Sequence, residues 1–144
     1  MQIRRMQISD TECVSEIERA IFSVPWSKQG FVDAVVRDDT IFLVAEEDDK
    51  ILGYIGMYMS MDEGEITNVA VAEDARRKGV GEALVTSVLQ ASEEQGITTV
   101  ILEVRVSNAG AIRLYSKNGF KECGVRKGFY DFPKEDAYIM IKEM

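Results

Sequence analysis

The chain has 144 residues, with 25 acidic and 17 basic side chains, no histidine and two cysteines, and its formal net charge is -8 at pH 7. We expect one domain spanning residues 1–144, and the acidic balance argues against a nucleic-acid binder, which needs lysine and arginine to displace the counterions of phosphates. Without histidine, and with Cys13 and Cys123 isolated from each other, we expect no metal, and any acid–base chemistry must use Glu, Asp, Tyr, Cys, Lys or backbone groups.

The first expected elements are a short strand at residues 3–6 and two helices. Ser9 or Asp10 can cap the first helix, because such side chains accept hydrogen bonds from the free N–H groups of a first turn. Apolar positions then recur every three or four residues, at Cys13, Ile17, Ala20 and Ile21. Ser27 is the expected N-cap of the second helix, whose inner face carries Phe31, Ala34 and Val35.

A β-hairpin is expected next, with strands at residues 41–46 and 51–59 around a turn at 48–50. Gly53 and Gly56 lie inside its second strand, where glycine indicates a bulge or the close approach of another backbone.

Strands and helices alternate in the rest of the chain. Strands are expected at residues 65–71, 98–104, 120–125 and 137–141. A helix from about residue 82 to 95 ends at Gly96, which suits the position just past a helix end, and Asn108 caps a further helix. This order predicts an α/β fold with a mixed sheet, in which hairpins at both ends supply antiparallel pairs.

The segment Arg76-Arg77-Lys78-Gly79-Val80-Gly81 lies between a predicted strand and a predicted helix. Glycines let successive N–H groups converge on one anion, and the helix start adds a positive dipole end, so the segment can bind phosphate. It is not a P-loop, because Glu82 follows Gly81, and it is not a dinucleotide fingerprint, because residue 84 is leucine. A helix start with a solvated basic run is the alternative.

Arg76-x-x-Gly79-x-Gly81 in this context resembles the acyl-coenzyme A pyrophosphate loop of the GNAT acetyltransferase superfamily. The resemblance covers nearly the whole chain, because Leu102–Asn108, Leu114-Tyr115 and Gly119-Phe120 also match its second half in order. Pro25-Trp26-Ser27 and Glu135-Asp136-Ala137 are similar to the RimI-type ribosomal-protein N-terminal alanine acetyltransferases. The resemblance to this superfamily implies a mixed, mostly antiparallel central sheet with helices on both faces, and acetyl-CoA as cosubstrate.

The same resemblance implies where the coenzyme binds, between two splayed strands. Its pantetheine arm would pair with Val69, Ala70 and Val71 as an added strand does. The pyrophosphate would be held by Arg76, Arg77, Lys78, Gly79, Val80, Gly81 and Glu82. Asn108 would hydrogen-bond the arm, and Tyr115 would contact the coenzyme near its sulfur.

Acetyl transfer to an amine needs a base, because an α-amino group with a pKa of about 7.7–8.0 is mostly protonated near neutrality. Without histidine, a carboxylate acting directly or through water is the expected base. We expect it to be Glu103, near the end of an apolar strand where burial can raise its pKa, and the resemblance assigns the same position. Pairing of Glu103 with Arg105 or Arg113 is the alternative, and Glu65 and Asp131 are substitute candidates.

Tyr115 is the expected acid for the departing thiolate, a role that the matching tyrosine carries in the superfamily. It lies seven residues after Asn108, about two turns along one helix, so both can face the coenzyme arm. By resemblance, the N–H of Val71 would stabilise the oxyanion. A buried structural tyrosine is the alternative.

The resemblance places Phe22, Pro25 and Trp26, together with Tyr130, over the mouth that receives the amine. An ordinary hydrophobic lid or core is the alternative. Phe129 stands where related enzymes often carry a second tyrosine, so one hydroxyl contact with the substrate is in doubt.

The favoured function is direct acetylation, in a ternary complex, of an N-terminal alanine on a small-subunit ribosomal protein. The alternatives are acetylation of a lysine side chain or a small amine, and a non-catalytic domain that senses acyl-CoA. Two free thiols, no apparent export leader and no apolar run of about 20 residues lead us to expect a cytoplasmic protein without a membrane partner. We expect a monomer or a weak homodimer.

Overall fold

The computed structural model describes residues 1–144 and contains one seven-stranded sheet of order β1-β2-β3-β4-β5-β7-β6. The strands are β1 Gln2–Arg5, β2 Thr40–Glu47, β3 Lys50–Ser60, β4 Glu63–Val71, β5 Thr99–Arg105, β6 Lys121–Asp131 and β7 Lys134–Glu143. The helices are α1 Thr11–Ile21, α2 Lys28–Val35, α3 Val80–Glu94 and α4 Ala109–Lys117, with short 3-10 turns at Ile8–Asp10 and Glu73–Ala75. None of these helices is long and apolar enough to cross a membrane.

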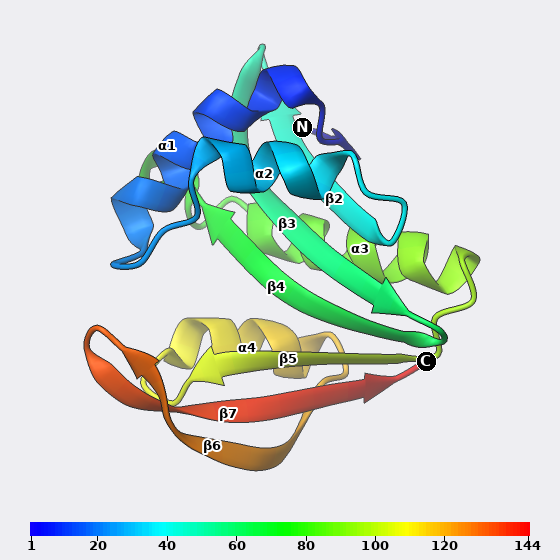
Figure 1. The fold of residues 1–144 in the computed structure, drawn as a ribbon, viewed down its shortest axis with the longest axis vertical. Coiled ribbons are helices and arrows are strands. Elements are labelled where there is room, and N and C mark those ends of the chain that lie inside the picture. The colour runs from blue at the N-terminus through cyan, green and yellow to red at the C-terminus, as the bar shows by residue number, and fades with distance from the viewer.

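The helices divide between the two faces of the sheet, as Figure 1 shows. Helices α1 and α2 cover the face that carries Phe42, Val44 and Tyr54, and they enclose the smaller hydrophobic core. Helices α3 and α4 cover the other face and enclose a core of 20 buried residues. The mixed sheet with helices on both faces confirms the fold class expected from the sequence.

Strands β4 and β5 form the only parallel pair, and they pair over only part of their length. Their register runs from Glu63–Thr99 to Ile66–Leu102, although β4 continues to Val71 and β5 to Arg105. The register of β4 against β3 passes from Met57–Ile66 to Gly56–Asn68, which leaves Thr67 as the extra residue of a bulge. Because a bulge bends its strand, β4 turns away from β5 where their pairing ends, and Figure 1 shows the two strands diverging there. We call this unpaired region, residues 67–71 of β4 and 103–105 of β5, the cleft.

Several local signals act as the sequence predicts. The Ser27 hydroxyl accepts a hydrogen bond from the Gly30 N–H (3.1 Å), and the Asn108 side chain caps α4 in the same way (3.1 Å to the Ala111 nitrogen). A Cβ on Gly56 would lie 2.2 Å from the Phe42 ring, so this strand does require glycine where another group approaches closely.

The buried face of α1 differs from the expected one. Cys13 and Ala20 are exposed, whereas Val14 and Glu18 are buried, with Glu18 only 3% exposed. Glu18 tolerates burial because its carboxylate accepts hydrogen bonds from the Trp26 N–H (2.9 Å) and the Tyr54 hydroxyl. The predicted inner face was located from apolar residues alone, so it missed the buried carboxylate and lies to one side of the face that is buried in the structure.

The last hairpin is longer than predicted, because β6 and β7 extend to a turn around residues 131–134. Val125 and Phe129 on β6 are exposed, so apolar and polar side chains do not alternate between the two faces of this strand as a prediction from sequence requires. Strand β6 is also irregular, with register shifts at Glu122/Gly124 and Arg126/Tyr130.

Candidate active site

A cradle of backbone N–H groups lies where β4 leads into α3. Arg77 and Gly79 both have left-handed backbone angles (φ 66° and 77°), and they turn the chain sharply into the helix. The N–H of Ala83, 3.1 Å from the Gly79 carbonyl, is the first that the helix satisfies, and residues 77–82 donate no backbone hydrogen bond in the turn. Such a run of free donors at a helix start is suited to an anion such as a pyrophosphate.

The side chains around the cradle leave it open. Arg77, Lys78 and Gly79 are exposed, and a Cβ on Gly79 would meet nothing within 4 Å. The Arg76 guanidinium instead turns back toward β4, where its Nε donates to the Val71 carbonyl (3.4 Å). The predicted anion-binding segment therefore has the required shape, with Arg76 as a support rather than as a group aimed into the turn.

The free edge of β4 leads from the cleft to the cradle. Val69 and Val71 are half-buried and Ala70 is buried, and β5 pairs with none of the three. A cofactor arm with amide groups can pair with such an edge as an added strand does. Gly81 continues this surface, because a Cβ there would lie 3.2 Å from the Leu114 side chain of α4. The residues present thus fit an acyl-CoA molecule along β4.

Two carboxylates lie close together on the face of the sheet that carries α1 and α2, in the part of this face that the two helices do not cover. Glu65 lies on β4 and Glu103 on β5, and the Arg126 Nε is 3.6 Å from the Glu103 Oε1. Burial raises the pKa of Glu65, and the nearby Glu103 carboxylate raises it further, while Arg126 opposes the shift. The carboxyl with the raised pKa is therefore that of Glu65, which was named from the sequence as a substitute candidate for the base. Glu103 pairs with Arg126 rather than with Arg105 or Arg113.

Tyr115 approaches the cleft from α4, on the opposite side of the sheet. Its side chain is 4% exposed and stacks edge-on against Phe120, with ring centroids 5.8 Å apart. The Tyr115 hydroxyl has no hydrogen-bond partner within the protein. No side-chain nitrogen or oxygen that is fully buried lacks a partner, so the Tyr115 oxygen is not fully buried and remains accessible. Burial raises the pKa of Tyr115, with a smaller contribution from Tyr130, so the phenol keeps its proton at neutral pH.

Tyr130 connects Tyr115 with the carboxylates. Burial raises the pKa of Tyr130, and so does the charge of Glu103, whereas Arg105 lowers it. The Arg105 guanidinium lies 4.2 Å from the centroid of the Tyr130 ring. Tyr115, Tyr130, Glu65 and Glu103 therefore form a chain of groups in which each influences the ionisation of a neighbour.

The α1–α2 loop and the β6–β7 turn are in contact. The Ser23 hydroxyl donates to the Phe132 carbonyl, and Arg105 donates to the carbonyls of Pro133 (2.9 Å) and Phe132 (3.2 Å). Exposed apolar side chains line these two segments: Phe22, Val24, Phe129 and Phe132. The two regions that the sequence predicts for the substrate are thus joined, with Phe22 exposed and Trp26 packed inward on Phe31 (5.2 Å).

Two residues that hold parts of this region in place, Arg126 and Glu18, were not predicted from the sequence. Arg126 lies on a strand whose alternation is irregular, and only the pairing of β6 with β7 and of β7 with β5 brings it to Glu103. Glu18 holds the α1–α2 loop through the Trp26 N–H, and its only sequence signal is its position one helical turn after Val14.

Comparison with known proteins gives a consistent result. The model of the Acetyltransferase (GNAT) family matches residues 11–120. A protein of Bacillus subtilis (strain 168), provisionally named as a [ribosomal protein bS18]-alanine N-acetyltransferase, is 37% identical over 96% of this chain and 92% of its own length. The [ribosomal protein bS18]-alanine N-acetyltransferase of Escherichia coli (strain K12) is 32% identical over 96% of this chain and 94% of its own. The crystal structure of the ribosomal-protein-S18-alanine N-acetyltransferase from Escherichia coli superposes with a TM-score of 0.90, at 30% identity, over 99% of this chain and 92% of that one.

Proposed function

The chain belongs to the GNAT acetyltransferase family, and we propose that it acetylates the N-terminal alanine of ribosomal protein bS18. It is an acetyl-CoA-dependent N-acetyltransferase, and acetyl-CoA supplies the acetyl group as a reactive thioester. The observation that carries the proposal is the cleft between β4 and β5, which has free backbone donors at one end and paired carboxylates beside an accessible phenol at the other.

The cradle of residues 77–82 and the free edge of β4 orient the coenzyme in this proposal. Their N–H groups are fixed by the fold before any ligand arrives, so binding requires little reorganisation. Asn108 uses its carbonyl oxygen to cap α4, which leaves the NH₂ of its amide to hydrogen-bond the arm.

Glu103 takes a proton from the incoming amine, directly or through a water molecule. Near neutrality most of an α-amino group is protonated, so the base must hold this proton while the amine reacts. Glu65 assists, because it lies beside Glu103 and a proton gained by Glu65 is stabilised by the charge of the Glu103 carboxylate.

Tyr115 gives a proton to the departing sulfur. Its raised pKa ensures that the hydroxyl carries the proton when the sulfur leaves, and its accessible oxygen allows contact with the coenzyme. We therefore expect Tyr115→Phe to lower kcat by roughly 10²–10⁴-fold with little change in coenzyme binding. Unchanged turnover would move the acid to another residue.

Release of free thiol from acetyl-CoA tests the substrate class. We expect turnover with a peptide that begins with alanine and much slower turnover with a lysine-containing peptide whose amino terminus is blocked, or with a polyamine. Preference for the lysine peptide or the polyamine would favour those amines as substrates. Tight coenzyme binding without thiol release for any amine would favour an acyl-CoA sensor.

The wider setting follows from the same proposal. The relatives act on a ribosomal protein, so the substrate is a protein N-terminus and the expected compartment is the cytoplasm. We infer a single catalytic domain that acts as a monomer or a weak homodimer, which sedimentation of the purified chain with and without acetyl-CoA would test.

A further inference from the structure

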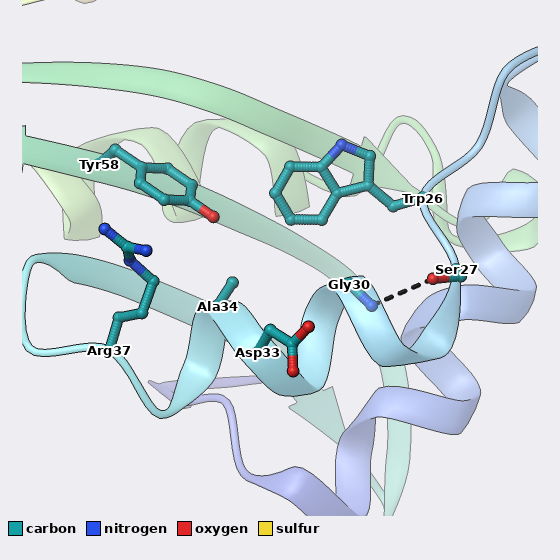
Figure 2. Close-up of a pocket in the computed structure, with 7 residues that line it drawn as sticks. All are labelled: Trp26, Ser27, Gly30, Asp33, Ala34, Arg37 and Tyr58. Carbon is teal, nitrogen blue, oxygen red and sulfur yellow. Dashed lines mark hydrogen bonds between the residues drawn. The ribbon is translucent and has the colours of Figure 1, made fainter.

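A pocket of about 470 Å³ lies between α2 and the sheet, outside the cleft that holds the proposed reaction. Figure 2 shows the indole of Trp26 and the phenol of Tyr58 on the sheet side of the pocket, with Asp33 projecting from α2 and Arg37 from the segment that follows this helix. Ala34 forms part of the helix wall, and its small side chain leaves the pocket open beside the two rings.

The walls of this pocket are aromatic and firmly held. The Trp26 ring lies 5.2 Å from Phe31 and 6.4 Å from Tyr58, the latter edge-on, and the backbone N–H of Trp26 donates to the buried Glu18 carboxylate. Fixed indole and phenol rings bind cations through their electron-rich faces without further ordering.

The charges around the rings favour a cation. Arg37 already lies over the Tyr58 ring, 5.6 Å from its centroid, so this environment accepts a guanidinium. Asp39 neutralises Arg37 through two hydrogen bonds (2.8 and 2.7 Å). Asp33 contacts only the amide of Gln29 (2.8 Å) and has no cationic partner. The pocket therefore offers two rings and one carboxylate whose charge is not neutralised.

The pocket lies on the same side of the sheet as the proposed base. Tyr58 pairs with Glu65 across β3 and β4, and Glu65 neighbours Glu103 on β5. Two strand spacings of about 4.8 Å separate the strand of Glu103 from that of Tyr58, or about 10 Å in all. An extended peptide covers this distance in about three residues, so a peptide with its amine at Glu103 brings roughly its third or fourth side chain to the pocket.

We propose that this pocket is a specificity site that takes an arginine or lysine side chain at the third or fourth position of the protein substrate. The cationic group lies against the Trp26 and Tyr58 rings, and Asp33 is its counterion. The inference rests on the proposed function, because it takes the position of the amine from that function.

A peptide series separates this proposal from the proposed function itself. All peptides begin with alanine and differ at the third or fourth position, which holds arginine, its neutral isostere citrulline, glutamate or phenylalanine. We expect arginine to exceed citrulline in kcat/KM by roughly five- to tenfold at one of the two positions, mainly through KM, and this preference to weaken at high salt.

Asp33→Asn removes the counterion and keeps the shape of the side chain. We expect the ratio of arginine to citrulline to fall toward one in this variant. The matched control is Glu93→Gln, which removes the same charge from an exposed position on α3, on the other side of the sheet, and keeps the wild-type ratio.

Equal kcat/KM for arginine and citrulline at both positions would overturn the proposal, and so would a preference for glutamate or phenylalanine. An unchanged ratio in Asp33→Asn would also overturn it. In all these outcomes the alanine peptides are still acetylated, and the proposed function stands. If the wild-type protein releases no thiol with any alanine peptide, the proposed function fails instead.

Discussion

Glu18 is a buried carboxylate whose removal should weaken both the fold and substrate binding. One oxygen accepts from the Trp26 N–H at 2.9 Å and the other from the Tyr54 hydroxyl. Glu18→Ala leaves both donors buried without an acceptor. Each hydrogen bond to a charged group contributes about 1.5–3 kcal/mol, so the free energy of unfolding should fall by about 3–6 kcal/mol. That is a large part of the about 5–15 kcal/mol that stabilises a domain.

Conservative variants separate the hydrogen bonds from the loss of volume. Glu18→Gln keeps the shape and can still accept from the Trp26 N–H while its NH₂ donates to the Tyr54 oxygen, so it should lose only about 1 kcal/mol. Tyr54→Phe leaves one carboxylate oxygen without its donor, and a double-mutant cycle with Glu18→Gln should show coupling of about 0.5–3 kcal/mol.

Urea denaturation measures these free energies, and Glu16→Ala, exposed on the same helix, is the control. Because Glu18 holds the backbone at Trp26, the Ala variant should also raise KM for the peptide while the Kd for the coenzyme stays unchanged. A loss for Glu18→Ala within about 0.5 kcal/mol of the control would refute the reasoning.

Three other perturbations test the cradle, the carboxylates and the N-terminal ion pair. Gly79→Ala forces a left-handed angle on alanine, so the free energy of unfolding should fall by about 1–2 kcal/mol. Isothermal titration should also show weaker coenzyme binding, because the added methyl group enters the cradle. Unchanged affinity would argue against coenzyme binding at this turn. Arg126→Gln removes a charge that lowers the pKa of Glu65, so the acidic limb of the kcat/KM profile should move to higher pH; a shift to lower pH would contradict the pairing. The hydrogen-bonded Arg4 lowers the pKa of Asp10, so this pair stabilises the fold above about pH 4, and its contribution is lost as the pH falls through the lowered pKa. Asp10→Asn should therefore reduce the free energy of unfolding by about 1–2 kcal/mol at pH 7 and make its decline in acid less steep. Urea unfolding at several pH values would show both effects.

Caps and special backbone angles were predictable because they depend on a few neighbouring residues. Ser27 and Asn108 act as N-caps, and Gly96 has the left-handed angle (φ 88°) expected just past a helix end. Gly79 has a left-handed angle as well, and its place between a strand and a helix marked the turn in which the backbone N–H groups are free. Each of these signals lies within one turn of the structure that it determines.

Pairings between distant segments were not predictable. Glu103 was expected to pair with Arg105 or Arg113, which are near in sequence, but the order β5-β7-β6 brings it Arg126 instead. The raised pKa of Glu65 also depends on how deeply the sheet buries it and on Glu103 across the strands. Such effects depend on tertiary contacts, which one sequence without an alignment does not reveal.

The bulge at Thr67 explains why the cradle and the two carboxylates lie beside the same unpaired region of β4 and β5. A parallel pair needs a crossover, and the crossover helix α3 begins at the carboxyl end of β4. The register shift beside Thr67 bends β4 away from β5 just beyond Ile66–Leu102, so the free donors at the start of α3 face an open cleft rather than a closed sheet. Helices α1 and α2 stop short of β5, which leaves Glu103 half-buried on the uncovered face beside that cleft. One extra residue in β4 thus lets this strand leave β5 while its pairing with β3 continues to Val71.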